Sequence, residues 1–63
     1  MRLREFHARV QEEFGTQFGE SLLRDHVLLV FGCTALAAIE RGTDPKRVWQ
    51  ALCKDFDVPK PRW

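Results

Sequence analysis

Four side chains in this 63-residue sequence could bind a metal ion or act as a nucleophile: His7, His26, Cys33 and Cys53. Zinc sites usually take two ligands from a short Cys-x-x-Cys or His-x-x-x-His spacing, and neither spacing occurs here. Cys53 falls on a predicted apolar helix face and is expected to be a small core residue. The sequence shows no helix start or basic setting that would activate either thiol. We therefore expect no metal site, no cofactor and no catalytic residue.

A second candidate for chemistry is the run Arg24-Asp25-His26 within an apolar stretch. Adjacent residues on a helix diverge by 100°, so Asp25 and His26 cannot form a catalytic pair on their own. One of them should face the core or its edge, and a buried carboxylate there needs a partner. Arg24, Arg2 or a free helix N-terminus could provide that partner. The favoured interpretation is structural pairing, and the alternative is a titrating or catalytic pair.

The clearest charge pattern lies in residues 44–56, DPKRVWQALCKDF. Asp44 can cap a helix, and Pro45 suits its first position because it lacks the N–H that a first turn leaves unused. At 100° per residue the side chains form an apolar arc and a neighbouring basic arc. The apolar arc consists of Val48, Trp49, Leu52, Cys53 and Phe56, and the basic arc consists of Lys46, Arg47, Gln50 and Lys54.

This helix and the one before it match a spacing used by DNA-binding helix-turn-helix motifs. Ala38 would let the two helices touch, Gly42 would make the turn, and Val48 would fill the crossing. Arg41 and Thr43 depart from the pattern, because such motifs usually carry apolar residues beside the glycine. An αα-hairpin with a glycine turn is the alternative interpretation.

Two functions follow from these patterns. In the leading hypothesis the chain is a DNA-associated accessory or regulatory module. The cations of the basic arc would bind phosphates, and Gln50 or Arg47 would reach base edges of double-stranded DNA. In the alternative it is a protein–protein interaction module, with a partner packing near Trp49 and Trp63 and no nucleic-acid binding.

The elements that must position these residues are four predicted helices, at 3–14, 17–31, 34–41 and 44–56, in a single domain of residues 1–63. The second helix is apolar nearly all round in its second half, so it is expected at the centre, with the fourth as the exposed working face. Residues 57–63 contain two prolines and are predicted to form an extended tail. Its last residues are either a strap covering the bundle, which we favour, or a short linear ligand. The predicted fold class is all-α, a small four-helix bundle whose third and fourth helices form a helix-turn-helix-like unit.

The charge, length and cysteine content of the chain argue against several classes of function. Ten basic and nine acidic residues give a net charge of +1, although residues 44–63 carry five basic and three acidic side chains. A chain this short cannot spare core volume for an enzyme pocket, so no enzymatic activity and no small-molecule substrate are expected. Two cysteines are too few for a secreted disulfide scaffold, and no apolar run is long enough for a signal peptide or a membrane span. These features predict a cytoplasmic protein with reduced thiols and no membrane partner.

Several segments together resemble a family of short actinobacterial proteins catalogued as domain of unknown function 3046. They are MRLREF at the start, FG at 14–15, RDHV at 24–27 and GTDPKRVWQALCKDFDVP at 42–59. The family has no assigned activity, so the resemblance transfers no catalytic or binding residue. It implies a free-standing cytoplasmic helical protein whose genes often lie near recombination and DNA-repair genes. A DNA-repair or recombination protein is therefore a possible partner by association.

Overall fold

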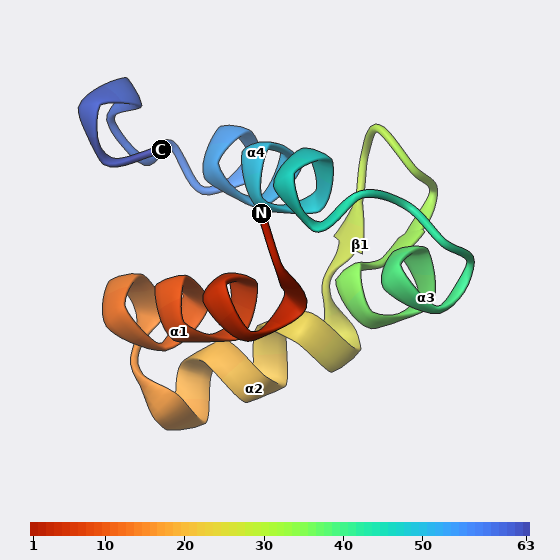
Figure 1. Ribbon diagram of the computed structural model, residues 1–63, viewed down its shortest axis with the longest axis horizontal. Helices are drawn as coiled ribbons and strands as arrows, with labels where there is room; N and C mark the ends of the chain where they lie inside the picture. Colours follow the sequence, from red (N-terminus) through yellow and green to blue (C-terminus); the bar gives the residue numbers. More distant parts are fainter.

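The computed structural model describes residues 1–63, which form four α-helices, a two-stranded antiparallel sheet and a short 3-10 turn (Figure 1). These elements are α1 (Leu3–Phe14), α2 (Thr16–Asp25), β1 (Val27–Leu28), β2 (Cys33–Thr34), α3 (Ala35–Glu40), α4 (Pro45–Asp55) and η1 (Lys60–Arg62). Helix α1 lies between α2 and α4, and α3 packs against both α2 and α4 (Figure 1). The prediction of an all-α bundle is therefore wrong, because the fold is mostly helical but includes a sheet. No helix combines the length and apolar character needed to cross a membrane.

The predicted ends of the first and fourth helices are confirmed to within one residue. Helix α1 spans residues 3–14, as expected from its single apolar stripe. The Asp44 carboxylate accepts a hydrogen bond from the backbone N–H of Lys46 at 3.1 Å, and Pro45 begins α4. The cap satisfies the Lys46 N–H, which a first helical turn cannot pair internally, and Pro45 has no N–H to satisfy.

The second predicted helix is corrected, because α2 ends at Asp25 and residues 27–34 form a short hairpin. Val27 pairs with Thr34 and Leu28 with Cys33. Gly32 has a φ of +66°, a left-handed conformation that glycine adopts without a steric penalty and that turns the chain back. We call residues 27–34 the hairpin.

Two physical effects explain why the helix stops. Val27 is β-branched, which disfavours helix and favours the extended backbone that it adopts in β1. In addition, the side chain of Asp55 in α4 contacts both His26 and the backbone N–H of Leu29. Those long-range contacts are available only when the chain leaves the helix after Asp25, so tertiary structure overrides the apolar pattern.

Helix α4, rather than the second helix, lies at the centre of the core. Its buried residues are Val48, Trp49, Ala51, Leu52 and Cys53, all at most 6% exposed. They pack with buried residues from the other elements, including Phe6, Val10, Leu22, Leu23, Leu28, Ala35, Ala38 and Val58. The predicted apolar arc is thus confirmed as core, with Phe56 partly buried at its end. The expectation of a central second helix is wrong.

Close packing of α1 on α2 depends on Gly19. A Cβ atom at this position would lie 3.1 Å from the Cγ1 atom of Val10, closer than side chains normally pack. The glycine costs about 1 kcal/mol in helix propensity, and its position against α1 explains why it stands inside a helix.

The remaining corrections concern α3 and the tail. The expected turn between α3 and α4 is present, with Gly42 at a φ of +92°. However, α3 has only six residues and adjoins a sheet, so the predicted helix-turn-helix-like bundle is not the architecture. The tail is not extended, because Lys60–Arg62 forms a 3-10 turn. Pro59 and Pro61 hold φ near the value that such a turn requires.

Candidate functional site

All four residues of the basic arc lie exposed on α4. The ion pairs of the structure are Arg9–Glu5, His26–Asp55 and Arg62–Glu13. None of them involves the three cations of the basic arc, Lys46, Arg47 and Lys54. The guanidinium of Arg47 lies 5.8 Å from the centre of the Phe31 ring, within the range of a cation–π contact.

The basic arc borders a groove of about 640 Å³, which we call the α4 groove. The hairpin, α4 and the segment after α4 together line it, with the residues Val30, Phe31, Arg47, Gln50, Ala51, Cys53, Lys54, Asp57, Val58, Lys60 and Trp63. Apolar side chains from the hairpin and the tail thus stand beside cations from α4. The sequence placed the basic arc on an exposed surface but did not reveal that this surface is hollowed.

Charge in the α4 groove is predominantly positive. Arg47, Lys54 and Lys60 contribute three cations, and Asp57 contributes the single carboxylate. The Lys60 ammonium lies 5.8 Å from the centre of the Trp63 ring. Two of the three cations therefore lie near aromatic faces that also line the groove.

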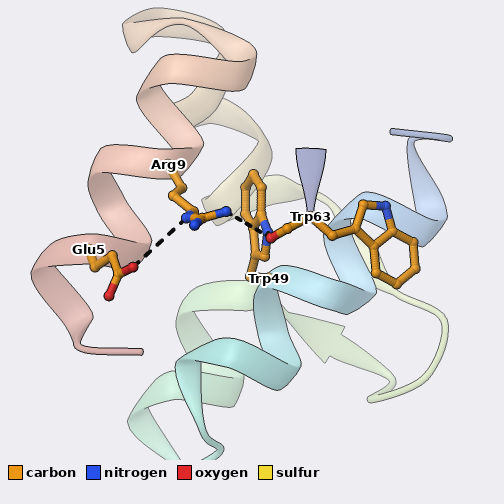
Figure 2. Close-up of polar contacts among 4 residues, drawn as sticks. All are labelled: Glu5, Arg9, Trp49 and Trp63. Atoms are coloured by element: carbon orange, nitrogen blue, oxygen red, sulfur yellow. Dashed lines mark hydrogen bonds and ion pairs between the residues drawn. The ribbon is translucent and has the colours of Figure 1, made fainter. Parts of the chain in front are cut away.

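Trp49 and Trp63 meet through a main-chain atom. The Trp49 Nε1–H donates to the main-chain oxygen of Trp63 at 2.7 Å, and the Arg9 Nη1–H donates to the same oxygen at 2.8 Å. The Trp63 Nε1–H donates to the main-chain oxygen of Val58 at 2.6 Å. Figure 2 shows the Trp63 indole turned away from Trp49.

These bonds make the tail a strap held against α1 and α4, which confirms the favoured interpretation of the tail. Arg62 adds an ion pair to Glu13 of α1, at 2.9 Å. Trp49 is only 2% exposed, so a partner that packs near the two tryptophans meets Trp63 first.

An exposed apolar tip lies beside the groove, at the turn of the hairpin. Val27 is 53% exposed, Leu29 86% and Val30 58%, although the sequence pattern had predicted them buried in a central helix. Leu28 alone in this run is fully buried. We call Leu29 and Val30, which lie in the turn, the hairpin tip, whereas Val27 is exposed at the base of the hairpin. The sequence signal that could have indicated it is the pair of β-branched valines followed by Gly32.

His26 pairs with Asp55, a residue that the sequence did not single out. The His26 Nε2 atom lies 2.9 Å from Oδ2 of Asp55, and the same oxygen accepts the backbone N–H of Leu29 at 3.3 Å. Asp25 is exposed and accepts a hydrogen bond from the Ser21 hydroxyl. The expected pairing of a buried Asp25 carboxylate with Arg24, Arg2 or a helix N-terminus is therefore wrong, and His26 is instead the residue of this run that lies at the edge of the core with a partner. The His26–Asp55 pair fixes the base of the hairpin to the end of α4.

The cysteine and histidine residues do not assemble into a reactive centre. His7, His26, Cys33 and Cys53 lie on different parts of the fold, and no three metal-ligating side chains come together in a way that could hold an ion. Both cysteines are free. Burial raises the pKa of the Cys53 thiol to about 11, with Glu13 adding to the rise and Arg9 opposing it. At neutral pH this thiol is protonated and therefore a poor nucleophile.

Comparison with known proteins places the chain in a family. Residues 1–61 match the family described as "Protein of unknown function (DUF3046)", so the chain belongs to it, as the resemblance in the sequence indicated. A protein of Mycobacterium tuberculosis (strain ATCC 25618 / H37Rv) with the name "Putative envelope-preserving system protein Rv2742c" is 57% identical over 37 residues. That match covers 57% of this chain but 13% of the relative, so the chain corresponds to a small part of a longer protein. No solved structure matches the chain.

Proposed function

We propose that this member of the DUF3046 family is a protein–protein interaction module that receives part of a partner protein in the α4 groove. The observation that carries this proposal is the combination of a concave surface, apolar walls and unpaired cations on one helix. Peptide-binding grooves commonly have this composition, with apolar contacts for affinity and charged groups for orientation.

The hairpin tip supports the same proposal. Burial of one valine or leucine side chain contributes about 1.5 to 3 kcal/mol, and a 63-residue chain has few such residues to spare. Val27, Leu29 and Val30 nevertheless stay in solvent. Contiguous exposed apolar residues on a small protein usually mark a surface that another molecule covers. The tip adjoins the groove through Val30, so one partner could cover both.

The relative supports a modular role. A segment similar to 37 residues of this chain makes up 13% of a longer protein whose name assigns it to an envelope-preserving system. A short segment that recurs within a longer protein suits an interaction module better than an enzyme. We place the module in the cytoplasm and assign it no catalytic role. Because of the family's genomic context, a DNA-repair or recombination protein is a partner class to test first.

Site-specific photo-crosslinking in native cells tests this proposal. A photoreactive amino acid at Val30 should yield a discrete adduct of fixed mass. The same group at Gln17, which is exposed on α2 and lines none of the cavities, should not. Lys54→Glu in the Val30-labelled protein should reduce the adduct, because Lys54 borders the groove. Equal labelling from both positions, or none from Val30, would contradict the proposal.

The second candidate function is binding of double-stranded DNA through the same α4 surface. The observation in its favour is that Lys46, Arg47, Gln50 and Lys54 are all exposed and that no acidic side chain pairs with the three cations. Lys46, Arg47 and Lys54 would contact phosphates, while Gln50 or Arg47 would reach base edges. The apolar hairpin beside Arg47 argues against this function, since a phosphate backbone offers it no partner.

A labelled duplex separates the two functions. DNA binding predicts an affinity that falls as salt is raised and that is lost in the double variant Lys46→Ala with Arg47→Ala. An interaction module predicts no binding of the duplex at micromolar protein in low salt. Salt-dependent binding that survives in Val30→Ser but not in the double variant would favour DNA.

A further inference from the structure

We infer that the partner segment in the α4 groove is an acidic amphipathic helix, an inference that rests on the proposed protein-interaction function. It would place apolar side chains against the hairpin and the tail, and carboxylates against the cations of α4. Its length, apolar stripe and charge follow from three features of the groove.

The first feature is the direction of the groove. Its α4 side follows Arg47, Ala51 and Lys54, which are spaced at i, i+4 and i+7 and therefore form one stripe along the helix. That stripe is about 10 Å long at 1.5 Å per residue, which matches two turns of a partner helix. Ala51 forms part of the floor of the groove between the two cations, and Gln50 also lines it.

The second feature is the apolar surface facing this stripe. Val30 is 58% exposed, and Phe31 and Trp63 are partly buried but line the groove. They come from the hairpin and the strap, so the apolar contacts lie beside α4 rather than on it. An amphipathic helix presents apolar residues at i, i+3 or i+4, and i+7, which can fill such a surface.

The third feature is the charge. Arg47, Lys54 and Lys60 face the groove without an ion pair, and Asp57 offsets only one of them. A guanidinium can bind a carboxylate through two parallel hydrogen bonds. A partner with Asp or Glu beside its apolar stripe therefore complements this rim, and a basic or neutral partner does not. The groove is concave, which favours a narrow rod over a flat lipid surface.

Three synthetic 18-residue helical peptides with the same leucine stripe and different flanking residues test the inference. The flanks are Glu, Gln or Lys, and binding to ¹⁵N-labelled protein is followed by amide chemical shifts. We expect the Glu peptide to bind roughly tenfold more tightly than the Lys peptide, since two or three favourable surface charge contacts replace repulsive ones. The shifts should concentrate on α4, the hairpin and residues 57–63.

Reversing a charge in the groove tests the preference, and reversing a charge elsewhere provides the matched control. Lys54→Glu should lower the affinity for the Glu peptide by roughly threefold to tenfold and raise the affinity for the Lys peptide. Arg4→Glu changes the net charge equally at an exposed position outside the cavities, and should leave the preference unaltered. Val30→Ser should weaken all three peptides, because it removes apolar contact without changing charge.

Equal binding of the Glu and Lys peptides, no binding of either, or shifts confined to α1 and α2 would overturn the inference. Sedimentation of the protein with phosphatidylglycerol vesicles, lost in Val30→Ser, would overturn it in favour of a lipid surface. A Val30 crosslink to a protein, combined with no preference for the Glu peptide, would retain the interaction function and reject the acidic partner. If neither the crosslink nor peptide binding is found, both proposals fail.

Discussion

The strap and the hairpin border the same helix, but the large apolar residue of the strap packs against the core, whereas most apolar residues of the hairpin are exposed. In the strap, Trp63 packs against the core, and its main-chain oxygen receives hydrogen bonds from Arg9 and Trp49. In the hairpin, only Leu28 is buried, and the tip points into solvent. Apolar composition alone would have placed the hairpin inside.

The difference teaches that polar anchors and backbone geometry decide which apolar residues are covered. The strap is fixed by hydrogen bonds from α1 and α4 and by the Arg62–Glu13 ion pair. The hairpin is fixed mainly at its base, where one carboxylate contacts His26 and Leu29. The Leu29 and Val30 side chains nevertheless remain exposed, because the contact with Asp55 involves only the backbone of Leu29.

The largest expected effect tests the contrast within the hairpin itself. Leu28→Ala should lower the free energy of unfolding by about 2 to 5 kcal/mol, because it leaves a cavity in the core. Leu29→Ala should change it by no more than about 0.5 kcal/mol, because Leu29 is 86% exposed. Urea denaturation of the two variants provides the measurement. Similar losses for both would show that the tip is packed in solution.

The pH dependence of stability tests whether the Cys53 thiol is buried in the folded protein. Burial raises the pKa of Cys53 from 9.0 to about 11, so between these values the folded thiol keeps a proton that the unfolded thiol loses. Stability should therefore fall as the pH rises, by about 1.4 kcal/mol per pH unit and about 2 to 3 kcal/mol in total. The free energy of unfolding, measured from pH 8 to 10.5, should fall more steeply with pH in the parent and in Cys33→Ala than in Cys53→Ala. Parallel curves would contradict this cause.

The anchor of the hairpin should have a smaller effect. Asp55→Ala removes the acceptor for His26 and Leu29, and should destabilise the protein by about 1 to 2 kcal/mol. The amide of Gly32, which donates to the Leu28 carbonyl within the hairpin, should also exchange faster with solvent. Asp25→Ala is the control, since the Asp25 side chain is exposed and contacts only Ser21 within its own helix. Unchanged exchange at Gly32 in Asp55→Ala would mean that the hairpin needs no such anchor.

The smallest expected effect concerns the strap. Arg9→Met keeps most of the apolar stem but removes the hydrogen bond to Trp63, which should cost about 1 kcal/mol or less. The Trp49 bond to the same oxygen remains and limits the loss. Denaturation of Arg4→Met, which lacks such a contact, provides the comparison. If Arg9→Met detaches the strap, the exchange of the Trp63 indole proton will rise sharply.

Much of the fold was predictable from local residue patterns. The cap at Asp44, the proline at the start of α4 and the apolar stripes of α1 and α4 depend on neighbours within one or two turns. The basic arc was placed on the solvent side for the same reason. The hairpin was not predictable in this way, because Val27–Phe31 is apolar enough to resemble a buried helix. Helix α2 ends before this segment because His26 pairs with Asp55, which lies 29 residues away in the sequence.

The sequence by itself determined the boundaries of two helices, the buried arc of α4 and the exposed cations beside it, because these follow from spacing along one helix. Tertiary structure alone decided that α4 is the centre, that Trp63 returns to meet Arg9 and Trp49, and that the hairpin tip stays exposed. It also formed the groove, since its walls come from segments that only folding brings together. The physical reason is that helical periodicity is a local property, whereas a concave surface exists only between distant parts of the chain.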